Sequence, residues 1–243
     1  MNVFFSPQYE VTLPGHVWPT SKYRLIKEKL ERSGLPGLTF MKPAPASWDD
    51  LALAHAPEYL SKLRDGTLTA DEIVTLELPW RREFADAFRL MVGGTCDASA
   101  AAIVDGRSAH LGGGLHHAFA GHGEGFCPLN DVAIAIRRLQ RDDRIARAAV
   151  IDLDVHHGNG TAMIFERDPS VFTFSMHQQH NYPFFKPRSD LDIGLEDGAG
   201  DERYLTALAG ALPRVVDARP DLLVYLAGAD PFQGDRQIGR AHV

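Results

Sequence analysis

The stretch that decides the fold reads Ala148-Ala149-Val150-Ile151-Asp152-Leu153-Asp154-Val155-His156-His157-Gly158-Asn159-Gly160. Its apolar first part predicts a buried parallel strand, and carboxylates and imidazoles follow where that strand ends. A second stretch has the same form, because apolar Leu222–Leu226 is followed by Ala227-Gly228-Ala229-Asp230. Open α/β sheets place their ligands at the carboxyl ends of their strands. We therefore expect both strand ends to contribute to one site.

Three side chains at these strand ends predict a metal site. Residues two apart in an extended segment project to one side, so Asp152, Asp154 and His156 can converge. Taken alone, an Asp after a strand is more often a helix cap or a turn residue. Several buried charges without a partner would be prohibitive, and a cation is the simplest partner. Asp154, His156 and Asp230 could hold zinc and leave one position open for water.

The rest of the chain alternates strands and helices. We expect strands at Val3–Phe5, Ala109–Leu111, Ala148–Leu153, Val171–Ser175 and Leu222–Leu226. We expect helices at Ser21–Glu31 with Thr20 as its N-cap, and at Trp48–Ala54, Pro57–Arg64, Arg81–Val104, Asp131–Leu139, Thr161–Arg167 and Glu202–Val216. Alternation without hairpin signals favours an α/β fold, a mainly parallel sheet with helices on both faces.

Composition limits the class of protein. The chain has 243 residues, 44% of them apolar, and a formal net charge of −7 without a Lys/Arg run, which argues against a nucleic-acid partner. Its two cysteines, Cys96 and Cys127, are far apart, so a reducing cytoplasm is expected. The start, Met1–Pro7, lacks the features of a signal peptide. No apolar run approaches ~20 residues, so we expect no membrane span. The oligomeric state stays open.

A glycine-rich stretch adds two adjacent histidines. It reads Gly112-Gly113-Gly114-Leu115-His116-His117-Ala118. An imidazole can act as a general base near neutral pH, and a neighbouring carboxylate or amide decides which nitrogen carries the proton. Asp152 and Asn159 are available for that role. The alternative for this stretch alone is a surface turn with incidental histidines.

Four motifs together resemble the zinc-dependent histone deacetylase superfamily, in particular bacterial deacetylases of the acetoin-utilisation type and the class IV branch. The similar stretches are Gly113–Ala118, Gly125–Asp131, Asp152–Thr161 and Ala227–Asp230. The opening Tyr9–Tyr23 and the stretch Leu191–Tyr204 are also similar to this branch. The similarity covers nearly the whole chain, in order. It implies an arginase-like α/β fold with a narrow tunnel that leads to a zinc ion.

The resemblance also implies roles for single residues. Asp154, His156 and Asp230 match the zinc ligands, with one ion per chain. His117 matches the general base and acid, and His116 matches its electrostatic neighbour.

Further matches concern the surroundings of this site. Asp152 matches the carboxylate behind His116. Asn159 stands where some relatives have an Asp behind His117. An amide stabilises an imidazolium less than a carboxylate does. Gly125 and Phe126 match the acyl-lysine tunnel. A structural monovalent cation, potassium, is implied at Asp152, Asp154, His156, Ser175 and Met176.

The activity implied is hydrolysis of an acylated lysine or a small acylated amine. The alternatives are an acetylpolyamine amidohydrolase and an inactive metal-binding fragment or pseudoenzyme. A manganese ureohydrolase of the arginase type is disfavoured, because a dinuclear site needs further bridging carboxylates where this motif has His156, His157 and Asn159.

The end of the chain departs from the resemblance. Relatives continue past the third zinc ligand into a glycine-rich loop whose tyrosine stabilises the oxyanion. Here the chain ends at Val243, and Ile238–Val243 can be back-translated into a common sequencing-adapter end. We therefore expect residues 1–236 to be a single catalytic domain that is incomplete at its C-terminus, and residues 237–243 to be a non-native tail. We also expect the chain as written to be nearly inactive.

Overall fold

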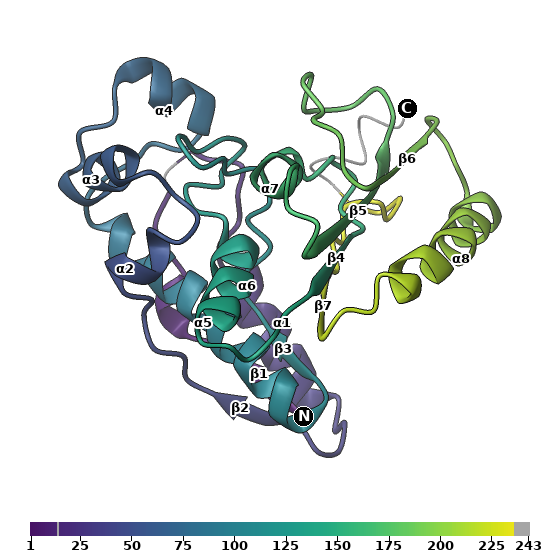
Figure 1. Ribbon diagram of the computed structural model, residues 1–243. Coiled ribbons are helices and arrows are strands. Elements are labelled where there is room, and N and C mark those ends of the chain that lie inside the picture. Colours follow the sequence, from purple (N-terminus) through teal and green to yellow (C-terminus); the bar gives the residue numbers. More distant parts are fainter. Residues whose placement is uncertain (14, 236–243) are drawn as a thin grey trace. The chain divides into compact units, whose positions relative to one another are not determined.

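Parallel pairing joins all the strands in the computed structural model, which describes residues 1–13 and 15–235. The chain divides into two compact units, Met1–Asp142 and Asp143–Val243, each with its own sheet (Figure 1). We describe each unit by itself. The expected single domain over residues 1–236 stays a prediction, and the expected tail over residues 237–243 lies outside the described residues.

The first unit contains a three-stranded sheet in the order β2-β1-β3. Its strands are β1 (Asn2–Phe4), β2 (Thr39–Met41) and β3 (Ser108–His110), and a short 3₁₀ helix, η1 (Pro7–Tyr9), follows β1. The expected strands near residues 3–5 and 109–111 are confirmed, shifted by one residue. The expectations omitted β2, because three residues are too few to show an alternating pattern.

The described part of the first unit also contains six α-helices. They are α1 (Lys22–Arg32), α2 (Trp48–Leu51), α3 (Pro57–Asp65), α4 (Ala70–Leu76), α5 (Phe84–Asp105) and α6 (Asp131–Arg141). The expected N-cap Thr20 is wrong. Ser21 stands at that position, and the Thr20 hydroxyl donates to the Val11 carbonyl at 2.8 Å instead. The unpredicted α4 begins at Thr69, whose side chain forms a capping box with Glu72.

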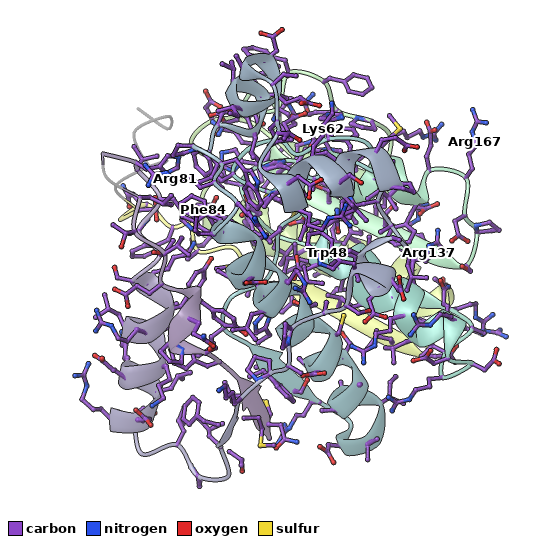
Figure 2. The ribbon with its side chains drawn as sticks, turned by 90° about the vertical axis from the view of Figure 1, so that its left-hand side faces the viewer. Trp48, Lys62, Arg81, Phe84, Arg137 and Arg167 are labelled. Carbon is purple, nitrogen blue, oxygen red and sulfur yellow. The ribbon has the colours of Figure 1, made fainter. Side chains whose placement is uncertain are left out.

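The helices of the first unit are held by apolar packing and a few surface pairs. Phe88 and Met91 of α5 and Ile134 of α6 are fully buried. Figure 2 labels Phe84, the first residue of α5, and Lys62 on α3, whose ammonium lies 2.6 Å from the Glu72 carboxylate. Helix α5 therefore packs against both α6 and the sheet of this unit.

Helix α5 passes a membrane-span test by length and composition alone, with a mean hydropathy of 1.3 over its most apolar window. However, 61% of that window is buried, and a core helix passes the same test. The expectation that the chain has no membrane span stays a prediction.

The second unit contains a four-stranded parallel sheet in the order β6-β5-β4-β7. Its elements are β4 (Ala148–Asp152), α7 (Asn159–Phe165), β5 (Val171–Gln178), β6 (Leu191–Leu195), α8 (Asp201–Asp217) and β7 (Leu222–Leu226). The three expected strands and two expected helices are confirmed. The expectations omitted β6, because an Asp and a Gly interrupt its apolar pattern.

Both faces of this sheet are covered, and its strand ends coincide. Ala211 and Val215 of α8 pack on one face against Ile151 and Phe174, while α7 contacts β5 (Figure 1). Asp152, the last residue of β4, pairs with Leu226, the last residue of β7. The segments that follow these two strands therefore start side by side, which positions the polar residues discussed next.

Candidate active site

The ends of β4 and β7 bring Asp154, His156 and Asp230 together. One ligand atom from each lies within 4.8 Å of the others. His156 Nδ1 lies 2.9 Å from Asp154 Oδ1 and 3.3 Å from Asp230 Oδ2. The Val155 N–H donates to Asp230 Oδ1 at 3.0 Å, so backbone from the β4 end fixes the carboxylate that follows β7.

The charge of this cluster favours a cation. Burial by itself lowers the pKa of His156, but the hydrogen bonds and charges of Asp154 and Asp230 raise it to about 9. Burial raises the pKa of Asp230, and the negative charge of Asp154 adds to that shift. Two carboxylates thus share one imidazole. A divalent ion relieves their repulsion better than one proton does, and the N and O donors fit zinc.

A close approach of the two chain segments depends on Gly228. A Cβ at this position would lie 2.6 Å from the Asp154 Cα. Any other residue would push the segment after β7 away from the segment after β4. The Ala-Gly-Ala-Asp motif therefore supplies both the carboxylate of Asp230 and the space that lets it reach Asp154.

Three further predicted residues lie close to this cluster in the sheet. Asp152 is buried at the end of β4, opposite Ser175 of β5, and its Oδ1 accepts the Asp154 N–H at 3.1 Å. Met176 is also buried. The potassium ion expected around these residues stays a prediction. Asn159 begins α7, and its side-chain oxygen accepts the Gly160 N–H at 3.0 Å.

The tandem histidines lie in the first unit and are buried. His116 and His117 are 4% and 5% exposed, and their ring centroids are 4.0 Å apart. The preceding Gly114 has a φ of 87°, which a side chain disfavours. The alternative of an exposed turn with incidental histidines is therefore wrong. The structure places the pair where its imidazoles need defined partners.

Asp131 anchors the loop that carries this pair. It is completely buried at the first position of α6, and its two oxygens accept the N–H groups of Gly114 at 3.0 Å and Leu115 at 2.7 Å. A Cβ at Gly113 would lie 2.3 Å from Asp131 Oδ2. Sequence reasoning included Asp131 in a motif but assigned it no role. Its only local signal is an Asp in the first turn of a helix.

A buried chain of hydrogen bonds extends outward from Asp131. The Thr95 hydroxyl donates to Asp131, His110 Nδ1 lies 2.9 Å from that hydroxyl, and His110 Nε2 lies 2.9 Å from the Tyr9 hydroxyl. Burial lowers the pKa of His110 to about 3, so its imidazole is neutral. A neutral ring donates once and accepts once, so Nδ1–H donates to Thr95 and the Tyr9 O–H donates to Nε2.

Phe126 forms an aromatic cluster in the first unit. Gly125 and Phe126 both have positive φ, 52° and 67°, and the Phe126 N–H donates to the Leu76 carbonyl at 2.8 Å. The Phe126 ring lies edge-on to His16 at 4.8 Å and stacks with Trp18 at 6.4 Å. This arrangement holds a half-buried aromatic ring in one orientation. Its contact with a substrate stays a prediction.

A second group of metal-ligating side chains was not expected as a cluster. His157, His177 and Asp192 each offer one ligand atom within 4.8 Å of the others. They come from the segment after β4, from β5 and from β6. No short motif could reveal this group, because its members are distant in sequence and one lies on the unpredicted strand.

The predicted site residues thus fall into two sets. The second unit brings together Asp152, Asp154, His156, Asn159, Ser175, Met176 and Asp230, and the first unit contains His116, His117, Gly125 and Phe126.

Comparisons with known proteins agree with the motifs. Residues 16–243 match the family model described as the histone deacetylase domain. The chain is 41% identical over 239 residues to an uncharacterised protein of Picosynechococcus sp., covering 96% of this chain and 79% of that protein. It is 34% identical over 257 residues to a protein of Methanothermobacter thermautotrophicus named "Probable deacetylase", covering 97% and 75%.

One solved structure confirms the fold. The crystal structure of the HDA15 HD domain matches with a TM-score of 0.79 at 24% identity, covering 97% of this chain and 76% of that chain. The expected α/β fold of the arginase and deacetylase type is therefore confirmed.

Proposed function

The chain belongs to the histone deacetylase family, and we propose that it is a zinc-dependent hydrolase that removes acetyl or related acyl groups from lysine side chains or small amines. The observation that carries this proposal is the cluster of Asp154, His156 and Asp230 at two neighbouring strand ends. Family membership supports hydrolysis of an acyl amide. The metal requirement and the substrate are the proposed parts.

Asp154, His156 and Asp230 would hold the zinc ion. When bound, zinc supplies a Lewis acid for the acyl carbonyl and lowers the pKa of its water. The two carboxylates match the charge of a divalent ion. Backbone N–H groups of Val155 and His156 already orient these carboxylates, at 3.0 and 2.9 Å.

His117 would transfer the proton. Its imidazole takes a proton from the attacking water and gives it to the nitrogen of the departing amine as the C–N bond breaks. His116 would add electrostatic stabilisation from 4.0 Å away, measured between ring centroids. Asp131 would keep both rings in place through the backbone of Gly114 and Leu115.

The substrate would be a slender acylated amine. A half-buried Phe126 ring, backed by Trp18, offers an apolar surface that suits the methylene groups of an acyl-lysine. Acetylated polyamines have the same amide and a similar methylene chain, so the same residues would serve both. A panel of acetyl-lysine peptides and acetylpolyamines distinguishes these substrates by their kcat/KM.

Metal content is the primary test, because it needs only the residues of this chain. We expect Asp154→Ala and Asp230→Ala to lower zinc affinity by roughly a hundredfold or more, measured by elemental analysis after dialysis and by competition with a chromogenic chelator. Far-UV circular dichroism controls for folding. Unchanged zinc affinity in both variants would refute the site.

Turnover is a separate measurement. We expect His117→Ala to slow hydrolysis by a factor of order 10²–10⁴ while zinc stays bound. Activity within a few fold of wild type would remove His117 from this role. The expected low turnover of this chain stays a prediction, and the same assay measures it.

A further inference from the structure

One residue beyond His156, the chain enters the second cluster, which the proposed hydrolysis does not use. We propose that His157, His177 and Asp192 form a second site for a divalent transition-metal ion such as zinc. This site lies wholly within the second unit. It does not depend on the proposed activity.

The sheet places two of the three ligands on one face. Ser175 and His177 are two apart on β5, so they share a face. Asp192 of β6 pairs directly with Ser175 and therefore lies on that same face beside His177. His157 reaches it from the loop between β4 and α7. Three separate segments thus converge on one point, as side chains of a metal site do.

The distances match those between ligands of one ion. His157 Nε2 lies 3.1 Å from Asp192 Oδ1, and the centroids of the His157 and His177 rings are 4.6 Å apart. Ligand atoms around a tetrahedral zinc ion, each about 2.0–2.1 Å from the metal, are roughly 3.3 Å apart. The proposed zinc ligands His156 and Asp154 show a similar separation, 2.9 Å.

Outer partners already orient two of the three ligands. The Ser175 hydroxyl lies 3.0 Å from His177 Nδ1, which leaves Nε2 as the coordinating nitrogen of that ring. The Ser189 N–H donates to Asp192 Oδ2 at 2.9 Å, which leaves Oδ1 turned to His157. Metal-binding imidazoles and carboxylates usually have such second partners, which fix their orientation.

One polar atom of the cluster has no hydrogen-bond partner among the described residues. His157 is completely buried, and within residues 1–13 and 15–235 its Nδ1 has no hydrogen-bond partner. A buried polar atom of this kind costs about 1–3 kcal/mol.

The donor set indicates which ions fit. Two imidazoles and one carboxylate favour zinc, copper or nickel over magnesium or calcium, which prefer oxygen ligands. The Asp192 side chain is 31% exposed, so an ion can enter from solvent and retain a water ligand, whereas both imidazoles are buried.

The test counts ions in the metal-stripped chain. We expect wild type to bind about two zinc ions per chain in calorimetric titration, confirmed by elemental analysis. Asp192→Asn and His177→Gln should each abolish one binding event or weaken it by roughly a hundredfold, and Asp154→Ala should abolish the other. His180→Gln is the matched control, because His180 is 70% exposed and should leave both events unchanged.

Cobalt substitution gives a second readout. Co²⁺ added to Asp154→Ala should produce a visible d–d spectrum from the remaining site, and Asp192→Asn in that background should remove it. If wild type binds one ion and His177→Gln and Asp192→Asn both retain it unchanged, the second site is wrong and the proposed function is unaffected. If Asp154→Ala alone retains two ions, the zinc site of the proposed function is wrong instead.

Discussion

Two regions of this molecule bury carboxylates, and they satisfy them differently. In the first unit, Asp131 accepts hydrogen bonds from the Thr95 hydroxyl and from the N–H groups of Gly114 and Leu115. In the second unit, Asp154 and Asp230 both approach the single imidazole of His156. Neutral donors surround the first carboxylate, whereas the other two share one ionisable ring.

This difference distinguishes a carboxylate that stabilises the fold from carboxylates that can bind a cation. A carboxylate with several fixed donors stabilises the fold it is part of, and removing it leaves those donors without an acceptor. Two carboxylates that share one imidazole repel each other, and a divalent cation relieves that repulsion. Burial alone therefore does not identify a functional Asp, but the nature of its partners does.

The largest expected contrast is in stability without metal. Asp131→Ala should lower the free energy of unfolding by about 3–5 kcal/mol, because Thr95 and two backbone N–H groups lose their acceptor. Asp230→Asn should change it by less than about 1 kcal/mol, because it removes repulsion with Asp154 and keeps an acceptor for Val155. Urea unfolding in the presence of a chelator measures both. Equal costs for the two substitutions would contradict the comparison.

Two histidines, one in each unit, should also make opposite contributions to the pH dependence of stability. Burial lowers the pKa of His55 in the first unit to about 4, so its contribution is complete above about pH 6.5 and is lost as the pH falls towards 4. His156 has a raised pKa of about 9, so its contribution without metal is complete below about pH 6.5 and is lost as the pH rises through 9.

Each of these effects should amount to about 3 kcal/mol. The measurement is urea unfolding of the metal-free chain at several pH values. His156→Gln should remove the loss of stability on the alkaline side. His55→Gln should reduce the loss on the acid side without abolishing it, because burial also lowers the pKa of His110 and of His177. A stability profile that does not change between pH 6.5 and 9 in wild type would remove the raised pKa from the explanation.

Zinc should stabilise the second unit alone. At a free zinc concentration of 100 times Kd, the expected gain from the Asp154 site is about 2.7 kcal/mol. Asp154→Ala should lose that gain, whereas Asp131→Asn should keep it, because Asp131 is not a ligand. Thermal unfolding with and without zinc gives the comparison. An equal loss in both variants would show that the effect is not specific to the strand ends.

The smallest expected effect is at the outer end of the Asp131 chain. Tyr9→Phe removes the hydroxyl that donates to His110 and should cost about 1 kcal/mol. Tyr225→Phe is the matched control. Tyr225 is exposed, so the loss of its hydroxyl should change stability little. If Tyr9→Phe lowers the free energy of unfolding as much as Asp131→Ala does, the hydrogen bonds from Tyr9 to Asp131 form and break together, and the loss is not that of a single bond.

Much of the site could be predicted because its residues are contiguous. Asp154 and His156 follow one strand within a few positions, and Asp230 follows another, so strand direction alone places them at one edge. The sequence-based predictions of secondary structure failed where an element was too short to show a pattern or where two neighbouring residues were equally suitable. Strand β2 is too short to show an alternating pattern. Thr20 and Ser21 are both acceptable N-cap residues for α1, and the sequence could not show that the Thr20 hydroxyl donates to the Val11 carbonyl instead.

The amino-acid sequence by itself determined the family, the parallel α/β fold and the strand ends that carry the ligands, since these depend on residue type and short spacing. Only the tertiary structure decided the role of Asp131 and the existence of the His157, His177 and Asp192 cluster. Asp131 contacts a loop 16 and 17 residues before it, and His157 meets Asp192 across 35 residues. Such contacts depend on how separate segments pack, which no local pattern encodes.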